Sequence, residues 1–171
     1  MFFFLALPRA ATAASEEELR AAYVFNFAAL VEWPTNALPL AAQQLKLCYI
    51  GQDDAPTGRG VESLARLAGL KVNNREIVFK RIQTTRELKN CHIAVLGEID
   101  HNATARLADV LRGASVVTIA MEGDAVSTSP EIAIRLAIEN DRMVFDVNSG
   151  YAKRAGLTFS SKLLRLARKS A

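Results

Sequence analysis

The sequence has few of the side chains that enzymes and metal sites use most. Its 171 residues include two histidines, two cysteines and one tryptophan. No stripe of five or more lysines and arginines accompanies the net charge of +3, so nucleic acid is not an expected partner. After the first few positions no apolar run approaches the roughly 18 residues of a membrane span. With half its residues hydrophobic and 23% charged, the chain suits one globular domain.

Nucleotide-binding patterns are missing as well. Gly51, Gly58 and Gly60 follow an apolar run, but they match neither the dinucleotide fingerprint nor the phosphate loop. The acidic residues of the same loop, Asp53 and Asp54, lack calcium-loop spacing and are better explained as solvated loop acids. We therefore predict no cofactor.

Catalytic constellations are equally hard to assemble. His92 and His101 have no nucleophile nearby, and a zinc site would need two further ligands. The adjacent Ser161 and Lys162 do not have the spacing of a serine nucleophile with a lysine base. We predict a non-catalytic chain with no metal.

The first 14 residues have several features of a secretory signal peptide. Phe2 to Leu7 is apolar, Ala11-Thr12-Ala13 fits the A-x-A cleavage rule, and the chain turns polar at Ser15. The apolar block is short and no lysine or arginine precedes it, which a misplaced start codon would explain. We predict a signal peptide over residues 1–14 and one domain over residues 15–171. The alternative is a hydrophobic N-terminus of a cytosolic protein.

The state expected for the two cysteines depends on the compartment. In a reducing compartment they would be buried small hydrophobes, whereas in the periplasm they tend to pair. Cys48 and Cys91 lie in or beside two apolar runs that have the composition of buried strands. Neighbouring strands could bring the two sulfurs within bridging range.

The spacing of apolar residues predicts an α/β fold. Helices are expected over 16–31, 61–69, 85–89, 102–112 and 148–155, with a last one after Ser160, and strands over 45–50, 77–82, 92–96 and 115–120. This alternation predicts a three-layer sandwich, with a Rossmann-like sheet and helices on both faces. A hairpin over 132–147 is expected to add antiparallel edge strands, which makes the sheet mixed. On the first helix, Asn26 lies beside an apolar face and is expected to need a hydrogen-bond partner.

Two long segments resemble the opening and closing signatures of the YfiR-like family. The opening one is Ala21-Ala22-Tyr23-Val24-Phe25-Asn26-Phe27-Ala28-Ala29-Leu30-Val31-Glu32-Trp33-Pro34. The closing one is Ala152-Lys153-Arg154-Ala155-Gly156-Leu157-Thr158-Phe159-Ser160-Ser161-Lys162-Leu163-Leu164-Arg165-Leu166-Ala167. Val144-Phe145-Asp146-Val147-Asn148, Cys48 with Gly51, and Cys91-His92-Ile93 are similar to interior family positions.

The resemblance implies a periplasmic regulator that often forms a homodimer. Its expected partner is the periplasmic domain of a membrane-bound diguanylate cyclase, whose repression lowers cyclic di-GMP and limits biofilm formation. Cys48 and Cys91 match the positions of one family disulfide, whereas a second family cysteine pair has no counterpart after residue 120. No direct membrane insertion is implied.

The candidate partner-binding residues are Arg142, Asn148, Lys153 and Lys162, near the hairpin and the closing helices. An interface needs apolar anchors within a polar rim, which these residues and the leucines of the last helix would supply. Asn148 also has the simpler explanation of a helix cap. The alternative function is a periplasmic small-molecule sensor that acts on another signalling protein and uses the loops at the strand ends as its pocket. An enzyme of unrecognised type is a third hypothesis.

Overall fold

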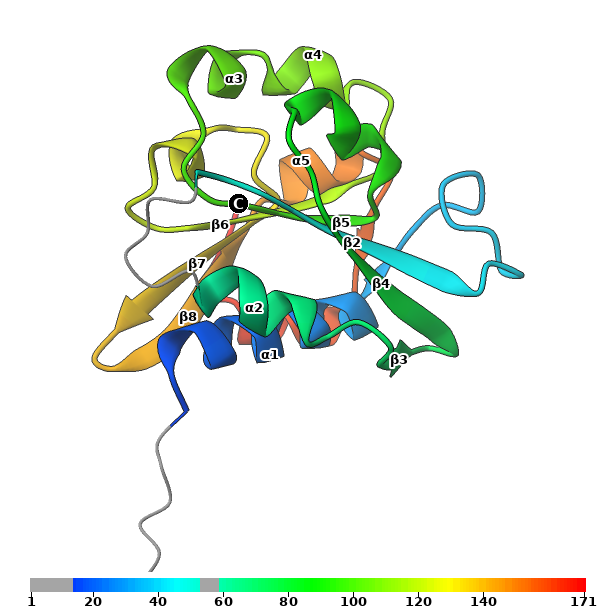
Figure 1. Cartoon of the computed structure of the whole chain (residues 1–171), viewed down its shortest axis with the longest axis horizontal. Coiled ribbons are helices and arrows are strands. Elements are labelled where there is room, and N and C mark those ends of the chain that lie inside the picture. Colours follow the sequence, from blue (N-terminus) through cyan, green and yellow to red (C-terminus); the bar gives the residue numbers. More distant parts are fainter. Residues whose placement is uncertain (1–13, 53–58) are drawn as a thin grey trace, which may run out of the picture.

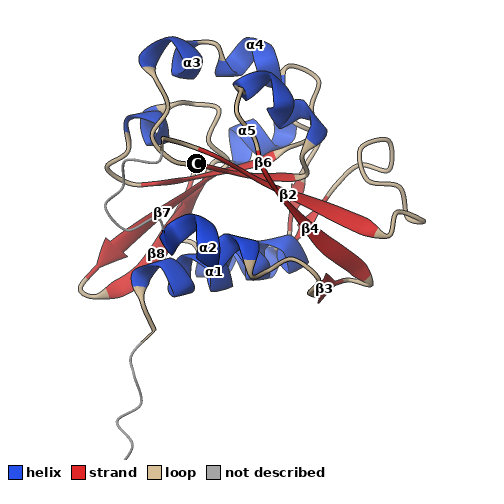
Figure 2. Ribbon diagram, viewed as in Figure 1, coloured by secondary structure: helices blue, strands red, loops and turns tan. Residues whose placement is uncertain are grey.

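The computed structural model describes residues 14–52 and 59–171, and it has a mixed sheet between two layers of helices (Figures 1 and 2). One helical layer contains α1 (Glu16–Leu30), α2 (Arg59–Ala65) and α6 (Ser161–Leu166). The opposite layer contains α3 (His101–Ala105), α4 (Leu107–Leu111) and α5 (Ser149–Arg154). The predicted three-layer α/β sandwich is confirmed.

The main sheet has the strand order β10-β8-β7-β6-β5-β2-β4-β3. The neighbours from β7 to β4 are parallel, β8 is antiparallel to β7, β3 is antiparallel to β4, and β10 is parallel to β8. The strands are β2 (Gln44–Ile50), β3 (Lys71–Val72), β4 (Arg75–Arg81), β5 (Ile93–Leu96), β6 (Val117–Met121), β7 (Ile134–Glu139), β8 (Arg142–Val147) and β10 (Lys169–Ser170).

Smaller elements complete the fold. A separate two-stranded ribbon pairs β1 (Val31–Glu32) with β9 (Thr158–Phe159). Two 3₁₀ helices, η1 (Thr85–Asn90) and η2 (Ala125–Thr128), lie in the connections that precede β5 and β7. No helix within residues 14–52 and 59–171 is long and apolar enough to cross a membrane.

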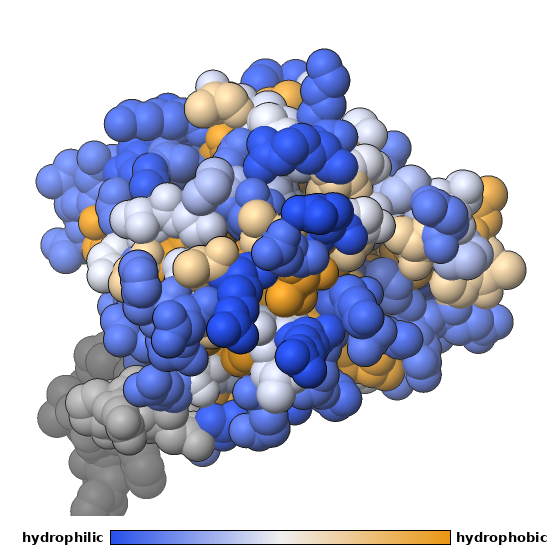
Figure 3. Space-filling view, turned by 90° about the horizontal axis from the view of Figure 1, so that it is seen from above, coloured by the Kyte–Doolittle hydropathy of each residue, from blue (hydrophilic) through white to orange (hydrophobic). Residues whose placement is uncertain are grey.

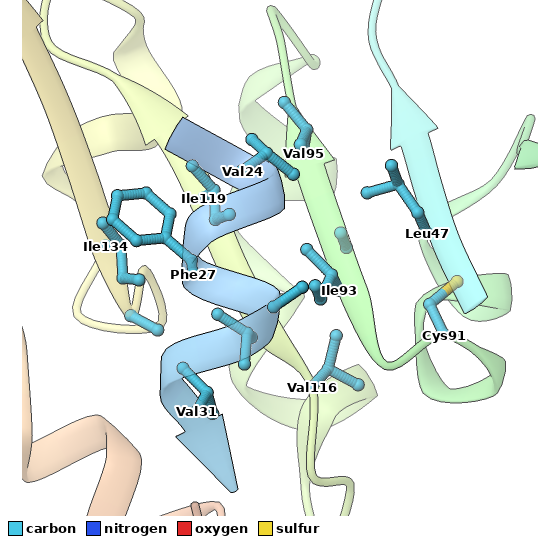
Figure 4. Close-up of a cluster of buried hydrophobic side chains, with 14 of the residues drawn as sticks. Val24, Phe27, Val31, Leu47, Cys91, Ile93, Val95, Val116, Ile119 and Ile134 are labelled. Atoms are coloured by element: carbon cyan, nitrogen blue, oxygen red, sulfur yellow. The ribbon is translucent and has the colours of Figure 1, made fainter. Parts of the chain in front are cut away.

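The first helix owes its start to a capping box. The Ser15 hydroxyl accepts a hydrogen bond from the Glu18 backbone N–H, and the Glu18 carboxylate accepts one from the Ser15 N–H. The helix then packs Val24 and Phe27 onto the sheet, with Val31 directly after it (Figure 4). The sheet residues in this cluster come from three adjacent parallel strands, and they are Ile93, Val95, Ile119 and Ile134.

The two cysteines form a disulfide, as the sequence analysis expected. It joins β2 to the residue after η1, with the Cα atoms of Cys48 and Cys91 6.0 Å apart. Both residues are buried. The bridge closes the loop between residues 48 and 91, which contains all of β4. In the sheet, β4 pairs with β2 on the side opposite β5.

Two expectations about the fold were wrong. The helix expected over 102–112 is two short helices that meet at Arg106. Of the hairpin strands, β7 is parallel to β6, and neither β7 nor β8 is the edge strand, because β10 covers the end of β8. The predicted last helix is α6, which ends at Leu166, and Arg168 and Lys169 follow it. The predicted signal peptide lies almost entirely outside the described residues, so it stays a prediction.

Candidate partner-binding groove

An apolar groove of about 440 Å³ lies between α1, the first half of β8, and α6. The two residues of β10 pair only with Asp146 and Val147 at the end of β8, so the first half of β8 has no strand neighbour on that side. The groove is lined by Tyr23, Asn26, Phe27, Ala29, Leu30, Met143, Val144, Phe145, Lys162, Leu163 and Leu166.

Three aromatic rings make the groove wall rigid. Tyr23, Phe27 and Phe145 pack edge to face, with ring centroids between 5.0 and 6.1 Å apart. The Tyr23 hydroxyl donates a hydrogen bond of 2.9 Å to the carbonyl of Met143 on β8. This bond occupies an outward-facing carbonyl of β8, so a side chain of α1 partly closes the strand edge.

The rim of the groove combines an exposed leucine with basic residues. Leu166 on α6 is 60% exposed, although it lines the groove. Lys162 lies one turn before it and is also exposed. Asn26 also lines the groove and is exposed on α1, so solvent can supply the hydrogen-bond partner that it was expected to need. An exposed leucine beside an apolar groove has the composition of an interface anchor within a polar rim.

The four predicted partner-binding residues do not share one surface. Lys162 lines the groove, and Arg142 is exposed at the start of β8, next to the groove residue Met143. Lys153 is exposed on α5, in the helical layer on the opposite face of the sheet (Figure 1). Asn148 caps α5, because its Oδ1 accepts the Tyr151 N–H at 2.9 Å while its Nδ2 donates to the Pro130 carbonyl. The structure therefore keeps two of the four together and gives Asn148 a structural role.

Sequence reasoning missed Leu166 and Tyr23 as groove residues. A signal for Leu166 was available, because Leu163, Leu164 and Leu166 cannot all face inward on one short helix. The structure buries Leu163 and leaves the other two exposed. For Tyr23 no such signal was available, because only its tertiary contact with β8 shows that it borders a groove.

An ionic cluster next to the groove fastens the C-terminal segment to β8 through Asp146, which directly follows the groove residue Phe145. The Asp146 carboxylate accepts hydrogen bonds from Arg168 at 2.7 and 3.0 Å and from Arg135 at 3.0 Å. The bonds from Arg168 are the main reason that the pKa of Asp146 falls from 3.8 to about 2, and burial opposes this shift. Arg168 also lies near Glu122 and Glu139. The cluster fixes the segment that follows α6 and hence helps to position one groove wall.

A second, polar cavity of about 550 Å³ lies at the carboxyl ends of β2, β4 and β5. The chain leaves β2 toward α2 and leaves β5 toward α3 on the opposite face, which makes this the topological switch point of the sheet. Gly51 lines it, and a Cβ at Gly51 or at the neighbouring Gly97 would come within 2.7 Å of the Tyr49 hydroxyl. Its rim includes Gln52 and Glu98.

Among the described residues, no group of three histidine, cysteine, aspartate or glutamate side chains is placed to hold a metal ion. Two of the acidic residues considered for a cation, Asp53 and Asp54, lie outside that part of the chain. Asp100 instead caps α3 by accepting the Ala103 N–H.

Figure 3 shows a face of the molecule that is mainly polar, with apolar residues only in separate patches.

A family model described as YfiR/HmsC-like matches residues 17–168, which is nearly the whole described domain. The chain belongs to the YfiR/HmsC-like family. The family match covers both walls of the groove, the disulfide and the ionic cluster around Asp146. No curated sequence is significantly similar to the chain.

Two solved structures are similar in overall shape. One is a conserved domain protein from Vibrio cholerae, with a TM-score of 0.49, 10% identity, and coverage of 92% of this chain and 60% of that one. The other is an ABC domain in complex with L-Trp from Streptococcus pneumoniae, with a TM-score of 0.47, 9% identity, and coverage of 80% of this chain and 58% of that one. This chain thus spans about three fifths of each, and neither likeness carries an argument about function.

Proposed function

We propose that this chain is a periplasmic regulatory protein that binds the periplasmic domain of a membrane-bound diguanylate cyclase and represses the enzyme. Membership of the YfiR/HmsC-like family supports a regulatory, non-catalytic role. The groove between α1, β8 and α6 is the proposed contact surface. The observation that carries this assignment is Leu166, which is 60% exposed beside an apolar groove with a rigid aromatic wall.

The charge of the rim supports a polar partner surface with acidic residues. Lys162 and Arg165 are exposed on α6, and Arg142 is exposed on β8 beside the groove. A complementary acidic surface on the partner would speed association and favour one orientation of binding. The groove would take an apolar side chain of the partner between Tyr23 and Leu166.

Deletion of the gene tests the function in the cell. We expect cyclic di-GMP and surface attachment to rise, and expression of the wild-type chain to restore both. Leu166→Asp and Lys162→Glu should fail to restore repression, whereas Lys153→Glu on the opposite face should restore it. Unchanged cyclic di-GMP after deletion under several growth conditions would refute the repressor function.

Direct contact needs a binding measurement with purified components. The probe is the purified periplasmic domain of a diguanylate cyclase from the same organism, chosen from a neighbouring gene where one encodes it. We expect Leu166→Asp to weaken the affinity at least about tenfold, because interface anchors typically contribute about 2 kcal/mol. An affinity that is equal for wild type, Leu166→Asp and Lys162→Glu would exclude the groove as the contact.

Export is part of the proposal. We expect cleavage near Ala13 or Ala14, which gives a mature chain that starts close to Ser15, the N-cap of α1. Mass spectrometry of the periplasmic fraction would detect this species, and a full-length cytosolic chain that retains Met1 would contradict it.

The polar cavity at the switch point supports the second candidate, a small-molecule sensor. Open α/β sheets bind ligands at this position, and Gly51 lines the cavity without a side chain of its own. A thermal-shift screen of polar metabolites would test it, since a ligand that binds only the folded state raises Tm. The control is Gln52→Glu, which alters the rim of this cavity and leaves the groove intact.

A further inference from the structure

The edge of β8 that faces the groove is closed to a further strand. Its Met143 carbonyl accepts a hydrogen bond of 2.9 Å from the Tyr23 hydroxyl. Two residues later, the Phe145 carbonyl accepts one of 2.7 Å from the Arg168 backbone N–H. A strand added to β8 would need these two acceptors, and it would lie about 4.8 Å away, in the space that the Tyr23 side chain enters. The groove therefore does not suit a partner that extends the sheet.

Both side walls of the groove are helical. The α1 wall is a single stripe of side chains at positions i, i+3, i+4 and i+7 of the helix, namely Tyr23, Asn26, Phe27 and Leu30. This stripe is about 10 Å long, at about 1.5 Å per residue. On the α6 wall, Leu163 and Leu166 are also one turn apart. The groove is thus elongated along α1, with the edge of β8 between the two helices.

A third helix is the element that such a pair of walls accommodates. Helices pack by fitting the side-chain ridges of one into the grooves of another, with axes about 8–10 Å apart. In helix-in-groove recognition, an amphipathic helix presents residues i, i+3, i+4 and i+7 to an apolar groove. The groove volume of about 440 Å³ holds more than one such side chain. A docked helix would also cover Leu166, which is 60% exposed.

Three exposed basic residues border the groove. Lys162 and Arg165 are on α6, and Arg142 is at the start of β8. The nearest carboxylate along β8, Asp146, is paired with Arg168 at 2.7 Å. Because opposite charges speed association and fix the orientation of a complex, the matching helix has acidic residues beside its apolar stripe.

We propose that the groove between α1, β8 and α6 binds an amphipathic helix of the partner, with its apolar stripe toward the groove and acidic residues along its flanks. The identity of the partner rests on the proposed function, and the element by which it is recognised is added here. Tyr23 has two roles in this recognition. Its ring forms part of the wall, and its hydroxyl keeps the edge of β8 closed.

Photocrosslinking identifies the element of the partner that occupies the groove. The purified full chain carries benzoylphenylalanine in place of Asn26 on α1 or of Leu166 on α6, and is irradiated with the purified periplasmic domain of the cyclase. We expect crosslinks within one partner segment, at residues three, four or seven positions apart. The same analogue in place of Lys153, on the opposite face, should give none. Crosslinks at every second residue, or from the two positions to unrelated segments, would overturn the helix.

Tyr23→Phe gives an independent test by the sign of its effect. The variant keeps the ring and removes the hydroxyl that occupies the Met143 carbonyl. For a docked helix we expect the affinity for the cyclase domain to fall by about twofold to fivefold, because the bond that holds the α1 wall to β8 is lost. A gain in affinity would mean that the freed carbonyl accepts a partner strand, and would overturn the helix. Photocrosslinking retains Tyr23 and decides the question if this variant is unstable.

The acidic flanks are tested by association kinetics. Lys162→Glu should slow association with the cyclase domain at low salt, and the difference from wild type should shrink at high salt. Lys153→Glu, on the opposite face, is the matched control. Equal association rates for wild type, Lys162→Glu and Lys153→Glu at low salt would overturn the charge complementarity.

The outcomes keep this proposal and the proposed function apart. If the wild-type chain does not bind the cyclase domain, the proposed function is refuted and the helix with it. If the chain binds and Leu166→Asp weakens the binding, but the crosslinks recur at every second residue, the partner and the groove stand and only the helix is overturned.

Discussion

The two sides of the sheet are held together by different chemistry. On the β2–β5 side, a buried disulfide and the neutral imidazole of His92 connect the strands. On the β8–β10 side, the Asp146 carboxylate and two arginines connect the C-terminal segment to the hairpin. The first side has a covalent cross-link that closes a long loop, whereas the second is held by ion pairs. The groove lies beside the second, which is the side that can be loosened without breaking a covalent bond.

The largest effect is expected from removal of the disulfide. Cys48→Ala with Cys91→Ala should lower the free energy of unfolding by about 4 kcal/mol, because the bridge closes a loop of 43 residues that the unfolded chain would otherwise sample freely. Urea unfolding of the oxidised wild type and of the double variant measures it. Two thiols that react in the denatured, unreduced wild type would show that the bridge does not form.

A smaller effect is expected on the ionic side. Asp146→Asn should lower the free energy of unfolding at neutral pH by about 2 kcal/mol, which corresponds to the lowered pKa of this nearly buried carboxylate. Arg142→Gln, an exposed residue on the same strand, is the control and should change stability by less than about 0.5 kcal/mol. Equal stability of Asp146→Asn and wild type would show that the ionic cluster contributes nothing.

The pH dependence of stability separates the two sides. Burial holds the pKa of His92 below 6.5 in the native state, so as the pH falls through 6.5 the unfolded chain binds a proton first and stability is lost. For Asp146 the same reasoning places the loss between about pH 3.8 and about pH 2. Thermal unfolding across pH should show the first loss absent in His92→Gln and the second absent in Asp146→Asn. A single transition common to all chains would contradict this separation.

The smallest effect on stability is expected at the groove rim. Leu166→Asp, Lys162→Glu and Lys153→Glu should each change the free energy of unfolding by no more than about 0.5 kcal/mol, because all three side chains are exposed. Only the first two should weaken partner binding. A marked loss of stability in Leu166→Asp would mean that this leucine serves the core, and the groove would lose its proposed anchor.

The sequence predicted most of the elements because their signals are local. The capped helix that starts after Ser15 and the buried parallel strands have the expected periodicity. The disulfide joins Cys48 on β2 to Cys91, which lies two residues before the neighbouring strand β5. The short elements were missed, since β1, β9 and β10 have two residues each and carry no periodic pattern. Charge alone could not show that the chosen site residues lie apart: Lys153 and Lys162 are similar in sequence context yet lie on opposite faces of the sheet.

The sequence by itself determined the family, the three-layer α/β architecture, and the cysteine pair. These depend on patterns that are contiguous or that repeat along one element. Only the tertiary structure decided that α1, β8 and α6 form a groove, that Asp146 joins the C-terminal segment to the hairpin, and that His92 contacts three separate parts of the chain. Each of these brings together residues that lie between about 20 and 140 positions apart, and their geometry follows from the packing of helices on the sheet rather than from any local preference.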